Sequence, residues 1–305
     1  MNPESIPERL IDIEALFAAK NPQLLKIIPG FVIRYLKKIT HQEEINGYIY
    51  RNRDKFGVPF LDAILKEFGV NVEVVDGRKQ IGDWGLGIRD KNTNISHLPS
   101  PISHLTTSIS SGRFIIVANH PLGGMDGMAL MYAIGQVRSD IVFPVNDLLM
   151  NVPGLKPLFI PINKHGSNTE NARIIATTFA SDKTILYFPA GLCSRKQGGG
   201  TICDLEWKKT FVTKARQYRR DVIPVFITGR NSDWFYNLAN WRKRLGIKAN
   251  IEMLYLVDEM VKQKGQTIKL IVGDTIPYST FDNSRSDNEW AGWVKDKVYQ
   301  LGMKN

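Results

Sequence analysis

Short apolar runs, each bounded by turn-forming residues, recur along the chain from about residue 114 onwards. They predict strands at residues 114–118, 141–145, 158–162, 184–188, 222–228 and 268–272. Between them, apolar residues recur at helical spacing and predict helices at residues 127–138, 169–181, 206–220 and 234–245. This alternation is typical of an α/β fold with helices on both faces of the sheet. We therefore expect a mixed sheet flanked by helices.

The first 95 residues have a mostly helical pattern, with helices expected at residues 7–19, 22–39, 45–52 and 58–68. The second helix has a broad apolar face, a break near Pro29 and Gly30, and the basic residues Lys26, Arg34, Lys37 and Lys38. Its composition suits a membrane surface, and packing on the neighbouring domain would explain it equally well. We divide the chain into an N-terminal helical, membrane-docking segment (1–95), an α/β domain (96–278) and a C-terminal helix (279–305).

Composition and charge narrow the class of protein. Hydrophobic residues make up 43% of the 305 positions, which is enough for a sizeable core. The excess of Lys and Arg gives a net charge of +10, which favours an anionic partner. No stretch reaches the roughly 18 uncharged apolar residues of a membrane-spanning helix, so we expect any contact with a membrane to be peripheral.

The cysteine content and the first residues favour a reducing cytoplasm. Only Cys193 and Cys203 are present, too few for a disulfide scaffold and without metal-site spacing, so we expect no bound metal. The first eight residues lack the charged-then-apolar pattern of a signal peptide.

A histidine and an aspartate follow the strand at residues 114–118. His120 comes directly after Asn119, and a glycine-rich loop leads from it to Asp126. A lone histidine after a strand is more often structural, but a loop that brings a carboxylate to the imidazole suits proton abstraction from a hydroxyl. No third residue is needed, because the substrate hydroxyl takes the place of a catalytic serine.

Three later segments complete an ordered set with this loop, at residues 159–164, 187–195 and 222–225. Together the four resemble the four blocks of the glycerolipid acyltransferase family, which includes bacterial lysophosphatidic acid acyltransferase. The resemblance covers roughly residues 110–230. The loop at residues 121–127 looks like a version from acyltransferase-like proteins of Bacteroidetes, some implicated in acylating lyso forms of amino-acid lipids.

The resemblance implies a catalytic dyad of His120 and Asp126, with Lys164 at the basic position that binds the acceptor's phosphate. The residues expected to bind substrate are Asn119, Lys164, Phe188, Pro189, Gly191, Ser194 and Arg195. Pro224 matches the fourth block. Backbone N–H groups of the Gly191 turn are the simplest candidates to stabilise the oxyanion of the thioester carbonyl.

Two positions depart from the family pattern. Five residues separate His120 from Asp126, where the family has four, and Ala190 replaces a glutamate. Gly123 and Gly124 can adopt conformations closed to other residues, so we expect them to absorb the extra residue and to leave the dyad within about 3.2 Å. Loss of the glutamate from the acceptor site, where Lys164 keeps a positive charge, favours an anionic head group such as that of an acyl-amino-acid lipid, rather than lysophosphatidic acid.

The expected function is an O-acyltransferase that moves a fatty acyl group from acyl carrier protein or coenzyme A to the hydroxyl of a lysolipid. It needs no bound cofactor and is expected at an anionic membrane surface, peripherally on the cytoplasmic face of the inner membrane. The alternatives are a lipid or thioester hydrolase with the same dyad, and a lipid-surface binding protein whose dyad has lapsed.

Two further features have less specific explanations. The basic residues at 206–220 and 241–244 could bind nucleic acid, but no nucleic-acid-binding signature accompanies them, so we expect no nucleic-acid partner. Cys193 could act as a thiol nucleophile with His120, although the matching family position is not a nucleophile.

Overall fold

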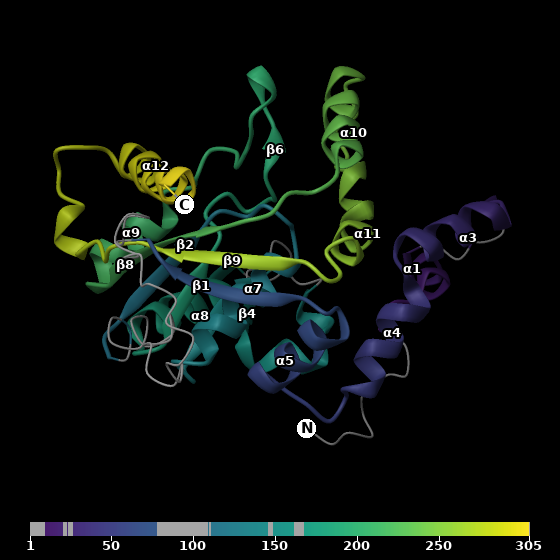
Figure 1. The fold of residues 1–305 in the computed structure, drawn as a ribbon, viewed down its shortest axis with the longest axis horizontal. Helices are drawn as coiled ribbons and strands as arrows, with labels where there is room; N and C mark the ends of the chain where they lie inside the picture. Colours follow the sequence, from purple (N-terminus) through teal and green to yellow (C-terminus); the bar gives the residue numbers. More distant parts are fainter. Residues whose placement is uncertain are drawn as a thin grey trace, which may run out of the picture.

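A computed structural model describes residues 10–20, 23, 27–77, 109, 111–145, 149–161 and 168–304. At its centre is a seven-stranded sheet with the strand order β1-β9-β8-β2-β5-β3-β4 (Figure 1). The strands are β1 (Asn71–Asp76), β2 (Phe114–Ala118), β3 (Ile141–Val145), β4 (Phe159–Pro161), β5 (Thr184–Tyr187), β8 (Asp221–Ile227) and β9 (Thr267–Val272). A separate two-stranded hairpin pairs β6 (Arg195–Lys196) with β7 (Ile202–Cys203).

Neighbouring strands of the sheet are parallel except at one junction. β8 and β9 pair antiparallel, so β1 and β9 run opposite to the other five strands. β2 lies in the middle, between β8 and β5, and its carboxyl end therefore meets the carboxyl ends of both neighbours at one edge of the sheet. Ligands of open α/β sheets bind at this edge.

The two faces of the sheet each have their own core, and β2 contributes to both. Ile116 and Ala118 pack into the cluster that contains residues of α5 and α7, whereas Ile115 and Val117 pack against α9 and α12. Side chains alternate across a strand, so a strand covered on both faces must be apolar throughout. This explains why all five residues of β2 are buried.

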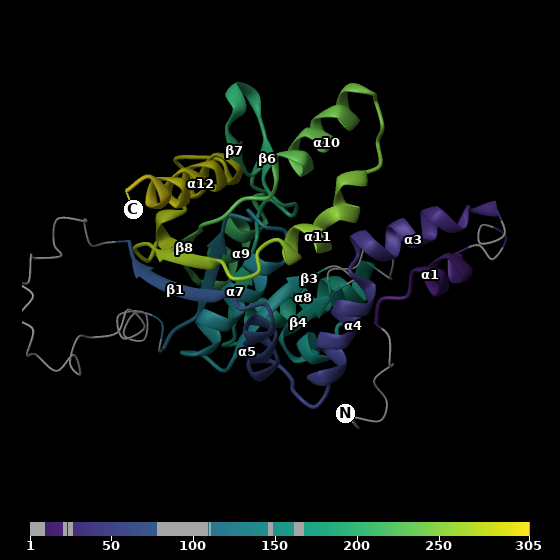
Figure 2. The ribbon, with the colours of Figure 1, turned by 45° about the vertical axis from the view of Figure 1, so that its right-hand side comes forward.

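The helices lie around this sheet, with the N-terminal ones grouped at one end (Figures 1 and 2). They are α1 (Ile13–Lys20), α3 (Gly30–Ile39), α4 (Gln42–Arg51), α5 (Val58–Glu67), α7 (Met125–Gly135), α8 (Asn168–Ala180), α9 (Thr210–Tyr218), α10 (Asp233–Arg244), α11 (Leu256–Val261) and α12 (Asp287–Lys304). Short 3₁₀ segments, including η6 (Ile251–Tyr255), connect several of them. In the described ranges, no helix is long and apolar enough to cross a membrane.

The predicted α/β fold with flanking helices is confirmed, and β2 and β3 have the predicted bounds. The break at Pro29 and Gly30 is also present, since α3 begins at Gly30. β1 was not predicted: it lies in the segment expected to be mostly helical and pairs with β9 in the main sheet. The helix expected at residues 206–220 begins only at Thr210.

Candidate active site

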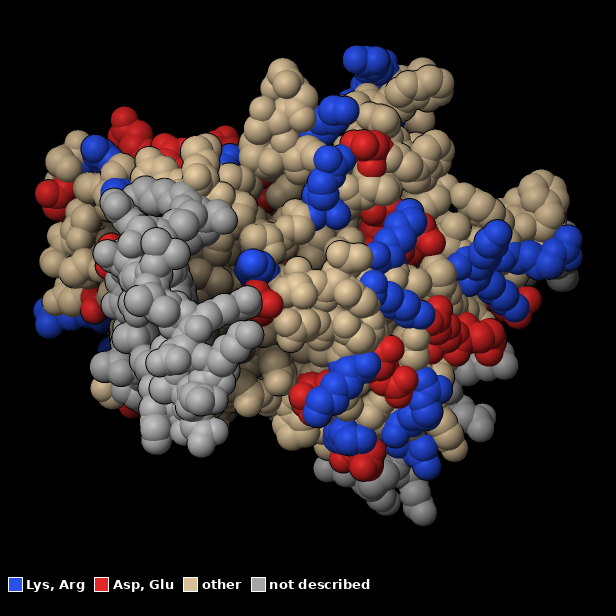
Figure 3. Space-filling view, viewed as in Figure 1, with Lys and Arg blue, Asp and Glu red and all other residues tan. Residues whose placement is uncertain are grey.

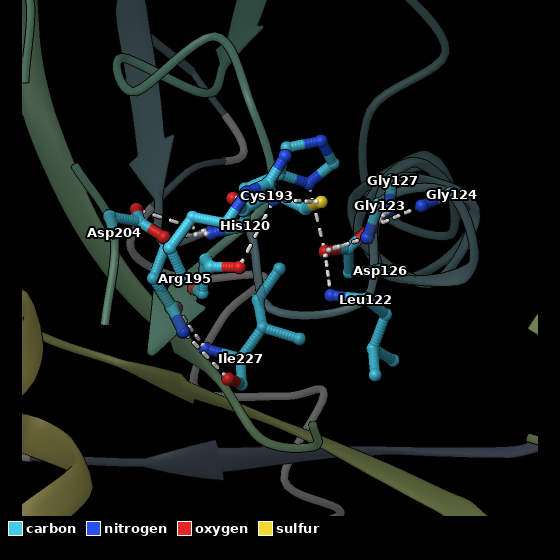
Figure 4. A network of polar contacts seen from close by, with 12 residues as sticks. His120, Leu122, Gly123, Gly124, Asp126, Gly127, Cys193, Arg195, Asp204 and Ile227 are labelled. Carbon is cyan, nitrogen blue, oxygen red and sulfur yellow. Dashed lines mark hydrogen bonds and ion pairs between the residues drawn. The ribbon is translucent and has the colours of Figure 1, made fainter. Parts of the chain in front are cut away.

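His120 lies just beyond the carboxyl end of β2, and Asp126 lies in the first turn of α7. The imidazole Nδ1 is 2.9 Å from the Asp126 carboxylate, which is fully buried, whereas the His120 side chain keeps 16% exposure. The predicted contact is confirmed. Figure 4 shows the ring turned so that its other nitrogen faces away from Asp126. Among the described residues, that nitrogen has no hydrogen-bond partner.

The loop between the two residues holds the carboxylate through its backbone. Asp126 Oδ2 accepts N–H bonds from Leu122 (2.8 Å) and Gly123 (3.2 Å), and Oδ1 accepts bonds from Gly124 (3.0 Å) and Gly127 (2.9 Å). Gly123 has a φ of +77°, which favours glycine, so this residue lets the longer loop return to the histidine. The N-terminus of α7 also favours a negative charge here.

The pKa values of the pair shift apart. Burial lowers the pKa of His120, but the charge and hydrogen bond of Asp126 raise it, and the net shift is upward. Burial raises the pKa of Asp126, but the charge and hydrogen bond of His120 and the backbone N–H groups lower it, and the net shift is downward. Asp126 therefore stays charged while His120 titrates, as an orienting carboxylate must.

Phe188 lies against the imidazole from the end of β5. The two rings stack with centroids 4.2 Å apart and an interplanar angle of 20°. The next residues form a turn in which Gly191 N–H donates to Phe188 O at 3.1 Å. Within the Gly191 turn, whose backbone N–H groups are the expected donors to the oxyanion, the N–H of Gly191 itself therefore already has a partner in this conformation. Ala190 is buried in the core between the sheet and α9.

A second buried carboxylate, Asp204, supports the site and was missed by sequence reasoning. It accepts the His120 N–H at 3.2 Å, the Ser194 hydroxyl at 2.6 Å and the Trp207 indole N–H at 2.8 Å. Its own N–H donates to the Tyr299 hydroxyl at 2.7 Å. Asp204 therefore joins the end of β2 to three segments that lie far away in sequence, and no local pattern around it indicates this.

Two of the residues expected to bind substrate have partners within the protein. The Asn119 side chain donates to Ile227 O at 2.9 Å and accepts its N–H at 2.6 Å, which joins the end of β2 to β8. Ser194 donates its backbone N–H to His120 O at 2.7 Å, in addition to its bond with Asp204. Both residues position the loops that carry the dyad.

Arg195 is also buried, and it belongs to an ion-pair network. Its guanidinium lies 3.1 Å from Glu252, which Arg242 of α10 contacts from the other side at 2.8 Å. The same guanidinium donates to Cys193 O at 2.7 Å. This network ties the β6 hairpin to α10 and η6, so Arg195 is bound within the protein rather than directed into open solvent.

Lys164 lies outside the described residues. Another lysine, Lys208, lies against the turn beside the dyad. Lys208 donates its backbone N–H to Pro189 O at 3.1 Å. Its Nζ lies 3.3 Å from the position that a Cβ on Gly191 would occupy. This exposed side chain was not among the predicted binding residues, although it belongs to the basic run that the sequence singled out.

Cys193 is an unsuitable nucleophile in this environment. The side chain is 1% exposed, and burial raises the pKa of the thiol to about 11. Because the thiolate is the reactive form, the thiol is not activated near neutral pH. The histidine and aspartate are the pair at this site that is arranged for proton transfer.

Known proteins resemble this chain in sequence and, more weakly, in structure. A sequence profile of the family described as "Acyltransferase" matches residues 102–305. Two curated proteins named lyso-glycine lipid O-acyltransferase, from Phocaeicola vulgatus and Bacteroides thetaiotaomicron, are each 46% identical over 294 residues, covering 96% of this chain and 95% and 97% of theirs. A crystal structure of the 1-acyl-sn-glycerophosphate acyltransferase PlsC from Thermotoga maritima aligns with a TM-score of 0.41 and 17% identity, covering 80% of this chain and 81% of its own.

Proposed function

The chain belongs to the acyltransferase family, and on this premise we propose that it transfers a fatty acyl group to the hydroxyl of a lyso-glycine lipid, with His120 as the general base. The observation that carries the proposal is the His120–Asp126 hydrogen bond of 2.9 Å, in a chain so similar to two lyso-glycine lipid O-acyltransferases. The donor is a thioester of acyl carrier protein or coenzyme A. In this proposal the enzyme acts peripherally at the cytoplasmic face of the inner membrane.

The reaction needs one group that accepts and returns a proton. The second ring nitrogen of His120, Nε2, takes the proton from the acceptor hydroxyl as the hydroxyl oxygen attacks the thioester carbonyl carbon. The tetrahedral intermediate expels the thiolate, which receives the proton from the imidazolium, so the products are an ester and a free thiol. Asp126 holds the ring by Nδ1 and stabilises its charged form.

The acceptor's head group fits the charge around the turn at residues 188–191. A lyso-glycine lipid ends in a carboxylate. The exposed Lys208 ammonium beside Gly191 supplies an opposite charge. Lys164 and Lys208 are the proposed contacts for this carboxylate.

Lipid analysis of a strain that lacks the gene tests the proposal. The expected result is accumulation of an N-acylated glycine with a free hydroxyl and loss of its O-acylated product. Complementation with the wild type restores the product, and complementation with His120→Ala, expressed to the same level, does not. Accumulation of lysophosphatidic acid instead would show that the acceptor is a different lipid.

A further inference from the structure

α10 carries an apolar stripe that faces solvent. Trp234, Leu238, Trp241 and Leu245 follow one another at the spacing i, i+4, i+7 and i+11, which places them on one side of the helix. Trp234 is 55% exposed, and Trp241 and Leu245 are each 66% exposed, whereas Leu238 between them is half-buried. The helix has a second apolar side with Phe235, Tyr236 and Ala239, which is buried in the protein. Packing within the chain therefore does not explain the stripe.

The exposed apolar residues of the molecule gather around this helix and the N-terminal helices. Of the twelve large hydrophobic side chains that are exposed in the described ranges, five lie between Trp234 and Leu254 and four between Leu16 and Tyr35. The two groups meet at Tyr255, whose hydroxyl is 2.7 Å from that of Tyr35 and whose ring packs edge-on against Trp234. They form one continuous surface rather than scattered residues.

The charges beside the stripe are basic. Lys243, Arg244 and Lys248 are exposed and have no ion-pair partner among the described residues. Residues 230–256 include two acidic side chains, and both form ion pairs with other residues. Asp233 pairs with Arg230, and Glu252 pairs with Arg195 and Arg242. Figure 3 shows Lys and Arg side chains at the tip of α10 and over α3. Exposed tryptophans beside unpaired cations are typical of helices that lie in the interface of an anionic bilayer.

The segment that follows α10, made of η6 and α11, reaches the loop between His120 and Asp126, which we call the dyad loop. η6 leads directly into α11, and Leu256 at its start lies 2.7 Å from the position that a Cβ on Gly123 would occupy. Met260 packs in the same way near Gly124, at 3.8 Å. A lipid that leaves a leaflet beneath α10 and η6 would therefore enter next to His120.

We propose that the α10 surface, defined as Trp234, Leu238, Trp241, Leu245, Lys243, Arg244 and Lys248, inserts into an anionic leaflet and delivers the acceptor lipid to the dyad. This rests on the proposed function for the identity of the acceptor. The bilayer contact itself is a separate property of the surface. α10 thereby contributes a membrane contact of its own, next to the N-terminal helices and joined to the dyad loop through η6 and α11.

Sedimentation of the full chain with vesicles tests the proposal. The vesicles contain phosphatidylcholine with about 30 mol % phosphatidylglycerol, a typical anionic fraction. Trp241→Ser with Leu245→Ser, and separately Lys243→Glu with Arg244→Glu, should each weaken binding by about tenfold or more. The matched controls are Leu149→Ser with Met303→Ser and Lys183→Glu with Lys297→Glu, which change exposed residues outside the surface and should bind like the wild type.

Two further measurements keep the test independent of folding and of the reaction. Vesicles with bromine-labelled acyl chains should quench wild-type tryptophan fluorescence, and Trp234→Phe with Trp241→Phe should remove most of that quenching. Acyl transfer to a monomeric short-chain acceptor should stay within about twofold of wild type in the surface variants, so a failure of the proposed reaction would be seen separately. Equal binding by surface and control variants would overturn the proposal. The proposal would also be overturned if the surface variants lost self-association, measured by ultracentrifugation, but bound vesicles like the wild type.

Discussion

At the scale of single residues, His120 is suited to act as a base because its two ring nitrogens face different surroundings. Nδ1 meets the buried carboxylate of Asp126, and the opposite side of the ring is left for a substrate hydroxyl. Phe188 covers one face of the ring and limits its rotation. Asp126 is itself held by backbone N–H groups, so the pair is organised before any substrate arrives.

The pH dependence of kcat/KM should report the upward pKa shift of His120. A general base acts in its neutral form, so activity rises as pH rises through its pKa. In the wild type, the midpoint of this rise should lie above the ordinary imidazole pKa of about 6.5. In Asp126→Asn the charge that raises the pKa of His120 is gone while burial still lowers it, so the midpoint should move to lower pH and kcat should fall. A midpoint that does not move in Asp126→Asn would show that another group titrates.

Lys208 should contribute to acceptor binding. Its ammonium lies against the turn beside the dyad, so Lys208→Ala should raise the KM for a lyso-glycine lipid by about tenfold, as expected for loss of one charged contact. The KM for the thioester should change little. Lys214→Ala, in the same basic run but on α9, is the matched control. Equal effects of both variants on the acceptor KM would mean that only the general charge of this region matters.

At the scale of elements, the loop from His120 to Asp126 depends on one glycine. Gly123→Ala would place a Cβ 2.7 Å from Leu256 Cδ2 at a φ of +77°. We expect a stability loss of about 1–2 kcal/mol and at least a tenfold loss in kcat, because the loop holds the Asp126 carboxylate. Gly198→Ala, at the tip of the β6–β7 hairpin with no neighbour within 4 Å, should be neutral in both measurements. Full activity in Gly123→Ala would mean that the loop geometry is not critical.

Asp204 should matter for stability because it accepts bonds from three segments. Asp204→Ala leaves the buried donors of His120, Ser194 and Trp207 without their partner, which should lower the free energy of unfolding by roughly 3 kcal/mol or more. Chemical denaturation measures this loss. Asp182→Ala, whose side chain is 96% exposed, serves as the control and should cost little. A similar small loss in both variants would contradict the anchoring role of Asp204.

The elements that could be predicted from the sequence are those with a strong local pattern. β2 was predicted because it is apolar on both faces. The contact between His120 and Asp126 was predicted because a glycine-rich loop joins the two residues directly after a strand. β1 was missed because its alternation of Val72 and Val74 with polar neighbours is weak beside helical segments. Asp204 could not be predicted, since its partners converge on it only in the folded chain.

At the scale of the whole molecule, the sheet places the His120–Asp126 pair beside the surface proposed to contact lipid. β2 and β5 bring His120 and Phe188 to one edge. The N-terminal helices and α10 form an apolar and basic surface, and α11 connects that surface to the dyad loop. The net charge of +10 agrees with an anionic surface as partner. The proposed reaction, with its acceptor in a bilayer and a water-soluble donor, needs this arrangement.

Acyl transfer by the purified chain tests the central claim most directly. An acyl-labelled thioester is supplied together with a lyso-glycine lipid, and the label is followed into the O-acylated lipid and into free fatty acid. The account predicts that the label enters the lipid in preference to free acid, and that His120→Ala lowers this rate by at least about 10² while remaining folded. Label released mainly as free acid, or transfer that persists in folded His120→Ala, would contradict it.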